Sequence, residues 1–253
     1  MKKEYYKWTE DKLKILYELY ATTSNDDLGK ILGISNRRTI AEYARKRGLK
    51  KEIDPSRKGT LKPLLEENNE SFYWLGFIMA DGWISKYGQL VIALSNKDEN
   101  HLRIIAELLK TNINNYTSSN KKGIQSRISV QDKDCGVELR NKMNIRDKKT
   151  YEIPNLNFVP DEFMLPFIIG FIDGDGSLTN SNIKIECWKN WAESFNYFGK
   201  YFKDKYNIEY RISFSKDKYV SIYFGRRESE LIKREMLKLN IPYLKRKWDL
   251  INN

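Results

Sequence analysis

The chain has 253 residues, a formal net charge of +11 and a sequence pI near 9.3. This length allows one large domain or two smaller ones, and the 40% hydrophobic content excludes a chain that is disordered throughout. Two cysteines and one histidine exclude a disulfide framework, a four-cysteine zinc site and any chemistry that needs two histidines.

The longest apolar run, residues 163–172, is only ten residues long and contains Pro166 and Gly170, which excludes a transmembrane helix. No secretory signal is visible, so the sequence predicts a location in the cytosol or in an organelle. The positive charge favours an anionic polymer as partner, although a merely soluble basic protein would have the same composition.

The N-terminal quarter holds most of the excess charge, with 16 Lys+Arg against 9 Asp+Glu in residues 1–62. Helical spacing predicts three short helices, of which Thr9 caps the first, Gly33 ends the second and Ser35 caps the third, at 36–47. A short helix, a glycine turn and a basic helix are typical of a helix-turn-helix domain.

This segment resembles the small helix-turn-helix domains of phage and bacterial DNA-binding proteins. The resemblance implies that the start of the third helix enters the major groove and that its end lies near phosphates. The residues concerned are Asn36, Arg37, Arg38 and Thr39 at the start, and Arg45, Lys46 and Arg47 at the end. A three-helix bundle with a solvated basic face is the alternative. We assign residues 1–50 to this domain and the polar, basic stretch 51–65 to a linker.

The rest of the chain repeats itself. "FYWLGFIMADGWIS" at 72–85 matches "FMLPFIIGFIDGDGSLT" at 163–179, which places Asp81 and Asp175 at equivalent positions. After each segment, the pattern predicts a strand, an amphipathic helix, two strands and a last helix. Two α-β-β-α-β-β-α units, at 66–155 and 156–253, therefore predict an α+β fold with pseudo-twofold symmetry.

Small residues recur four positions apart on the helix that opens each unit. They are Gly76 and Ala80 in the first helix, and Gly170 and Gly174 in the second. Such a stripe lets two helix backbones pack closely, which would bring Asp81 and Asp175 together at the helix ends. Two adjacent carboxylates stay ionised only beside a cation, and hard oxygen ligands suit Mg²⁺ or Mn²⁺.

"WLGFIMADG" (74–82) and "IIGFIDGDG" (168–176) resemble the two LAGLIDADG motifs of single-chain homing endonucleases. The resemblance covers roughly residues 66–253. It implies two antiparallel sheets that form a saddle over double-stranded DNA, and metal-dependent hydrolysis of both strands. It also implies that Asp81 and Asp175 bind the metal, with the carbonyl groups of Ala80 and Gly174 as minor ligands.

The two copies depart from the motif in different ways. Met79 stands in the first copy where Asp173 stands in the second. Asn96 matches a polar position of the family's active site, and its counterpart falls at Trp188. Lys133 and Arg227, near the end of the last strand in each half, are candidates for the basic residues that stabilise the transition state. A solvated charge beyond a strand end is the alternative for both.

The alternating strands in "YRISFSKDKYVSIYFGRR" (210–227) predict a sheet face along the major groove, with Arg211 and Arg226 among the DNA contacts. We therefore predict a monomeric, site-specific homing endonuclease that makes metal-dependent double-strand breaks. One alternative is an RNA-splicing maturase on the same fold, which would bind intron RNA. The other is a non-catalytic DNA-binding regulator, against which the intact Asp81 and Asp175 argue.

Overall fold

The computed structural model describes residues 6, 8–21, 23, 25–50, 59–117, 124–145, 156–179 and 181–251. The chain divides into two compact units, Met1–Pro55 and Ser56–Asn253. Each unit has its own hydrophobic core. Within the described ranges, no helix is long and apolar enough to cross a membrane.

The first unit contains three helices, α1 (Glu10–Leu19), α2 (Asn25–Leu32) and α3 (Arg37–Lys46). The Thr9 hydroxyl accepts a hydrogen bond from the Lys12 N–H and caps α1. Gly33 follows α2 with φ +68°, a left-handed conformation that favours glycine. Asn36, rather than Ser35, caps α3, because its Oδ1 accepts from the Arg38 N–H at 3.0 Å. The cap therefore lies one residue later than the sequence predicts.

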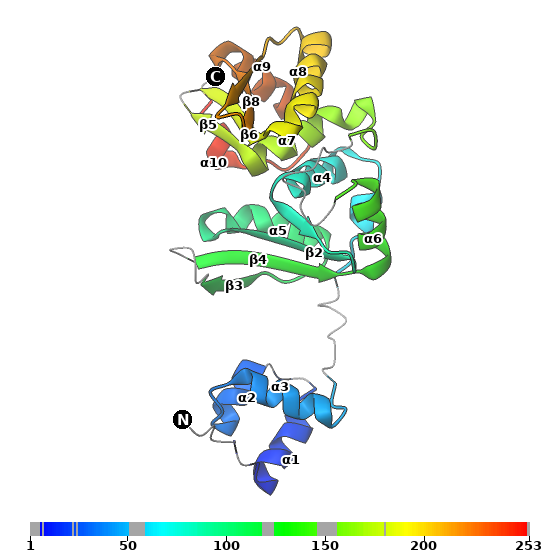
Figure 1. Ribbon diagram of the computed structural model, residues 1–253, viewed down its shortest axis with the longest axis vertical. Helices are drawn as coiled ribbons and strands as arrows, with labels where there is room; N and C mark the ends of the chain where they lie inside the picture. Colours follow the sequence, from blue (N-terminus) through cyan, green and yellow to red (C-terminus); the bar gives the residue numbers. More distant parts are fainter. Residues whose placement is uncertain are drawn as a thin grey trace. The chain divides into compact units, whose positions relative to one another are not determined.

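The second unit is built from two halves with the same order of elements (Figure 1). The first half consists of α4 (Asn69–Asp81), β1 (Gly82–Ile84), β2 (Gln89–Ser95), α5 (Glu99–Leu108), β3 (Asn114–Thr117), β4 (Ile124–Gln131) and α6 (Lys133–Lys142). The second consists of α7 (Met164–Asp175), β5 (Gly176–Thr179), β6 (Asn182–Trp188), α8 (Ala192–Tyr206), β7 (Arg211–Ser215), β8 (Tyr219–Phe224) and α9 (Arg226–Leu237). A short helix, α10 (Lys245–Trp248), follows the second half.

Each half forms a four-stranded antiparallel sheet, with strand order β1-β2-β4-β3 in the first and β5-β6-β8-β7 in the second. Alternate side chains of β2 and β6 are buried against the helices, and the intervening ones are partly or fully exposed. The helices thus cover one face of each sheet and supply the core. This duplicated, antiparallel arrangement confirms the α+β fold class predicted from the sequence.

Part of the stretch assigned to the linker packs on the first half. Leu61 and Leu64 are fully buried. The Leu61 N–H and the Thr60 hydroxyl both donate to the Asp132 carboxylate, at 2.9 and 3.1 Å. These hydrogen bonds lower the pKa of Asp132, although burial opposes them. Residues 51–58 of the linker and 146–155 at the junction of the two repeats lie outside the described residues.

Candidate catalytic centre at the paired helix ends

Helices α4 and α7 lie side by side between the two halves, as Figure 1 shows. A Cβ atom at Gly76 would stand 1.9 Å from the Phe167 carbonyl oxygen, and one at Gly170 would stand 1.9 Å from that of Tyr73. Each glycine therefore faces the backbone of the other helix, with no room for a side chain. A Cβ atom at Gly174 would likewise stand 2.3 Å from the Cβ atom of Ala80.

This packing brings the C-terminal ends of both helices together. A Cβ at Gly174 would lie 3.4 Å from the Asp81 backbone nitrogen. Asp81 and Asp175 are the last residues of their helices, and both side chains are exposed. Helix C-termini carry partial negative charge, so the two carboxylates add to a region that is already negative. Such a region attracts a cation.

One cation of the chain already lies at this end of α7. Lys247, on α10, donates from Nζ to the carbonyl oxygens of Asp173 at 2.6 Å and Gly176 at 2.8 Å. It also contacts those of Gly174 at 3.2 Å and Ile172 at 3.3 Å. Burial lowers the pKa of Lys247, and the charges of Asp173, Asp81 and Asp175 oppose that shift. The positive charge of Lys247 thus interacts with both motif aspartates and partly compensates the negative charge at the end of α7.

Sequence reasoning missed Lys247. The available signal was the basic run Lys245, Arg246 and Lys247 immediately before a tryptophan, on a segment with no strong helical pattern. Only the tertiary structure shows that Lys247 contacts the end of α7, which lies about seventy residues earlier in the chain.

The structure does not bring Lys133 and Arg227 to this centre. Both are exposed and lie in the first turn of α6 and α9. In the first sheet, Ile128 lies level with the start of β1, since it pairs with Ile92, which pairs with Gly82. Lys133 is five residues beyond Ile128, roughly 16 Å further along the sheet, and its backbone contacts the turn between β1 and β2.

The second sheet has the matching register, in which Gly176 pairs with Ile185 and Ile185 with Ile222. Arg227 is again five residues beyond. Both basic residues therefore lie at the end of the sheet that is remote from the motif aspartates, because the last strand runs away from the helix ends.

Asn96 lies in the 3₁₀ turn that follows β2, and its Oδ1 accepts from the Ser126 hydroxyl at 3.1 Å. The matching 3₁₀ turn after β6 begins at Lys189. Counting from the paired residues Ile92 and Ile185, Lys189 is the counterpart of Asn96, one residue later than the Trp188 expected from the sequence. Lys189 is exposed.

The donors present at the helix ends fit a hard divalent cation. They are two exposed carboxylates, and the chain's single histidine lies elsewhere, in α5. The described residues contain no cluster of three or more His, Cys, Asp or Glu side chains that could enclose a metal. A cation held here would therefore need further ligands from water or a bound phosphate. The Gly174 carbonyl already accepts a hydrogen bond from Lys247, which competes with its expected role as a minor ligand.

The residues expected to bind DNA in α3 are largely exposed. Asn36, Arg38, Arg45, Lys46 and Arg47 are exposed and Thr39 is half-buried, while the side chain of Arg37 is outside the described set. The Arg47 guanidinium lies 3.4 Å from the centre of the Tyr43 ring, which stacks on Trp8 at 4.0 Å. The Arg47 side chain thus packs against Tyr43 within the unit.

On the second sheet, Arg211 is exposed on β7 and is paired in register with Tyr223. Arg226 begins α9 and forms an ion pair with Glu230 at 3.0 Å. Both arginines line one hollow of about 400 Å³, together with Glu209 and Glu228.

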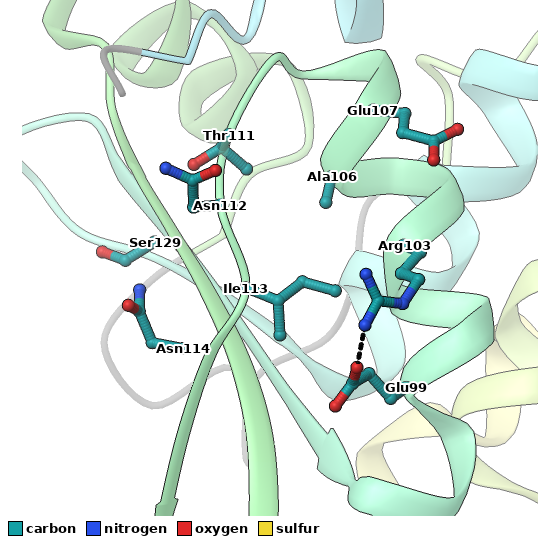
Figure 2. Close-up of a pocket in the computed structure, with 9 residues that line it drawn as sticks. All are labelled: Glu99, Arg103, Ala106, Glu107, Thr111, Asn112, Ile113, Asn114 and Ser129. Carbon is teal, nitrogen blue, oxygen red and sulfur yellow. Dashed lines mark hydrogen bonds and ion pairs between the residues drawn. The ribbon is translucent and has the colours of Figure 1, made fainter. Parts of the chain in front are cut away.

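Another hollow lies on the first half, away from the motif aspartates. It measures about 680 Å³ and is bounded by α5 and the segment leading into β3. Figure 2 shows Arg103 paired with Glu99 at one side of it and Asn112, Asn114 and Ser129 at the other. None of the site residues expected from the sequence lines it.

No protein-family model matches the chain, and no curated protein matches it. Solved structures do match. The homing endonuclease I-WcaI bound to its DNA recognition sequence aligns with a TM-score of 0.55 and 19% identity, over 91% of this chain and 99% of that one. I-DmoI in complex with DNA and Ca aligns with a TM-score of 0.51 and 15% identity, over 72% of this chain and 96% of that one. The chain therefore has the fold of these homing endonucleases.

Proposed function

We propose that the chain is a site-specific, divalent-metal-dependent endonuclease that cuts both strands of a double-stranded DNA target. The observation that carries the proposal is the pair of exposed carboxylates, Asp81 and Asp175, at helix ends held together by backbone contact at Gly76 and Gly170. Structures similar in fold include I-WcaI and I-DmoI complexes with DNA, which supports DNA as the substrate.

Asp81, Asp175 and Lys247 would have separate roles in the reaction. Asp81 and Asp175 would hold Mg²⁺ or Mn²⁺ through their hard oxygen ligands. The bound ion would supply charge neutralisation and water activation at the scissile phosphate. Lys247 adds a fixed positive charge beside the helix ends, where negative charge accumulates as the phosphodiester is attacked.

The uncovered sheet faces would lie along the DNA, with Arg211 and Arg226 on the second half contacting it. The α3 helix of the N-terminal unit would add a separate helix-turn-helix contact, through Asn36, Thr39 and the exposed basic residues. One chain carries both halves of the centre, so we propose that it acts as a monomer.

The test is to select bound duplexes from a randomised DNA pool with the full-length chain and then to measure their cleavage in Mg²⁺ and in Mn²⁺. Asp81→Asn and Asp175→Asn should each lower double-strand cleavage by about 1,000-fold or more, because each removes a ligand charge at the reacting phosphate. DNA affinity without metal should stay within about tenfold of wild type, since neither carboxylate attracts phosphate.

Asp134→Asn is the matched control, because Asp134 is an exposed aspartate in the first turn of α6. It should cleave like wild type. Near wild-type cleavage by either motif variant would remove that carboxylate from the mechanism. A wild-type chain that binds the selected DNA but cuts it in neither metal would instead be a non-catalytic DNA-binding regulator.

A further inference from the structure

The acidic residue that breaks the symmetry between the two motifs is buried. Asp173, on α7, is 1% exposed. Its Oδ2 accepts hydrogen bonds from the Tyr73 hydroxyl at 2.7 Å and the Leu244 N–H at 2.8 Å, and its Oδ1 accepts one from the Trp248 Nε1–H at 2.7 Å. A buried carboxylate is costly unless such donors compensate it. Asp173 therefore joins the first half, through Tyr73, to the C-terminal segment.

The hydrogen bonds of Asp173 extend through Tyr73 to His101 in the first half, and the donor and acceptor of each bond can be assigned. The Tyr73 hydroxyl has one proton, which it donates to Asp173. The 2.8 Å contact between Tyr73 and His101 is then satisfied by donation from the His101 Nε2–H. Both Tyr73 and His101 are buried.

Tertiary contacts must hold α10 in place, because a helix of four residues is not stable by itself. Asp173 binds the residue just before α10, Leu244, and the last residue of α10, Trp248. Arg246 adds a two-pronged ion pair to Asp98 in the first half, with one bond of 2.6 Å. Lys247 lies between these anchors, and its Nζ is 2.6 Å from the Asp173 carbonyl oxygen.

We infer that Asp173 is a positioning residue, whose carboxylate fixes α10 through Leu244 and Trp248 and thereby holds the Lys247 ammonium at the end of α7, beside Asp81 and Asp175. The first half has Met79 at this position, so its motif helix offers no equivalent carboxylate. The placement of Lys247 stands on geometry alone, whereas its effect on DNA cleavage rests on the proposed function.

The isosteric change Asp173→Asn tests the anchor. An asparagine side chain has one acceptor oxygen and one NH₂ group. If the asparagine oxygen accepts from Tyr73 and Leu244, its NH₂ group faces the Trp248 N–H. Both groups are donors, so no hydrogen bond can form between them. Loss of that hydrogen bond should loosen α10 while the core helices stay packed.

The first measurement does not depend on catalysis. The full-length chain, without DNA, is acetylated with acetic anhydride, and each lysine is quantified by mass spectrometry. Acetylation of Lys247 should be slow in wild type and about tenfold or more faster in Asp173→Asn, the change expected when one hydrogen bond is removed from a local opening equilibrium. The exposed Lys245, on the same helix, is the internal reference and should not change.

Tyr73→Phe is the matched control, because it removes the donor from the first half and leaves both α10 donors in place. It should change Lys247 acetylation by less than about twofold. Trp248→Phe serves also if Asp173→Asn fails to fold. It removes the indole N–H together with the five-membered ring that carries it, keeps the Asp173 charge that raises the pKa of Lys247, and should also accelerate the acetylation of Lys247. Unchanged reactivity of Lys247 in both Asp173→Asn and Trp248→Phe would overturn the inference.

The second measurement uses cleavage of the selected DNA by Asp173→Asn, Lys247→Met and the double variant. If Asp173 acts through Lys247, the double variant should have the kcat of Lys247→Met alone, with KM unchanged. Multiplicative losses would show that Asp173 does not act through the lysine. A wild-type chain that cuts no DNA would refute the proposed function, and the acetylation rates would still decide the placement of Lys247.

Discussion

The two halves of the second unit are alike where backbone meets backbone. Gly76 and Gly170 each lie against a carbonyl group of the opposite helix. At either glycine an added Cβ would stand only 1.9 Å from the carbonyl oxygen, which is a steric clash. Each helix provides the surface against which the other packs, so the same steric demand acts on both sequences. The likeness extends to the helix ends, where Asp81 and Asp175 each precede a glycine that begins a strand.

Among the described residues, the halves differ where the second motif helix contacts the segment that contains α10. Tyr73 and Phe167 occupy equivalent positions, as do Met79 and Asp173, yet only Tyr73 and Asp173 are joined by a hydrogen bond. The segment that contains α10 follows the second half and binds Asp173. In the part of the chain that the structure describes, close packing fixes the centre symmetrically, and the cation seen at the helix ends, Lys247, lies on the segment that follows the second half.

The largest expected effect tests the symmetric part. Gly76→Ala and Gly170→Ala should each lower the free energy of unfolding by about 3 kcal/mol or more, because the new Cβ meets a backbone oxygen that cannot move alone. The two decreases should agree closely. Urea unfolding of both variants, compared at constant m value, measures them.

Gly225→Ala is the control for the glycine-to-alanine change itself. A Cβ there would meet only the flexible carboxylate of Glu228, and φ is −69°. Gly225 is the N-cap of α9, where alanine is less favourable than glycine, so the free energy of unfolding should fall by only about 1 kcal/mol. Very unequal decreases at Gly76 and Gly170 would show that one helix can shift away from the other.

Local patterns in the sequence predicted the duplicated fold because each half repeats a strong order of helices and strands. The motif aspartates were visible for the same reason, since the apolar run and its small residues are contiguous. The Asp173 network was not, because its partners Leu244 and Trp248 lie more than seventy residues away and α10 has no amphipathic repeat of its own.

The positions of Lys133 and Arg227 could not be predicted from the sequence for a different reason. Lys133 and Arg227 follow the last strand in each half, but strand direction decides which end of the sheet that is. Only the register shows that this end is remote from Asp81 and Asp175. The burial of His101 likewise depends on a residue of another helix, Tyr73.

The next effect concerns a titratable group of the first half only. Burial lowers the pKa of His101 from 6.5 to about 4. Between these values the unfolded chain binds more protons, so stability rises with pH and is lost as pH falls from about 6.5 to 4. His101→Gln should remove a change on the order of 3 kcal/mol in the free energy of unfolding, summed over this pH range.

Asp173 acts in the opposite direction, because burial raises its pKa from 3.8 to about 6. The informative quantity is therefore the unfolding free energy of wild type minus that of His101→Gln, measured by urea unfolding from pH 4 to 7. That difference should increase with pH. A difference that is independent of pH would mean that His101 is protonated equally in both states.

A smaller effect concerns the N-terminal unit, whose helix α3 has no counterpart among the other residues that the structure describes. Under the proposed function, Arg38→Ala, Arg45→Ala and Lys46→Ala on α3 should together weaken DNA binding, and the slope of log affinity against log salt should fall by about 0.9 for each phosphate that the variant no longer neutralises. Cleavage of saturated DNA should not change. The DNA footprint should shrink at one end only, because α3 has no counterpart.

Lys14→Ala provides the control within the same unit, since Lys14 is exposed on α1. It should leave the salt slope unchanged. A symmetric loss of protection in the α3 variant would show that these residues do not contact DNA at one end of the target.

The smallest effect returns to the two halves, at the turn that follows β2 and β6. Asn96 is neutral and Lys189 is cationic at equivalent positions, and both are exposed. If each turn faces a phosphate, Lys189→Ala should lower the salt slope by about 0.9, and Asn96→Ala should leave it unchanged. Lys189→Asn makes the halves alike and should match Lys189→Ala in slope, because the slope depends on the charge and not on the size of the side chain. Equilibrium binding over a range of salt concentrations, without divalent metal, separates these outcomes from cleavage. Equal slopes in wild type and both Lys189 variants would mean that the turn after β6 does not face a phosphate.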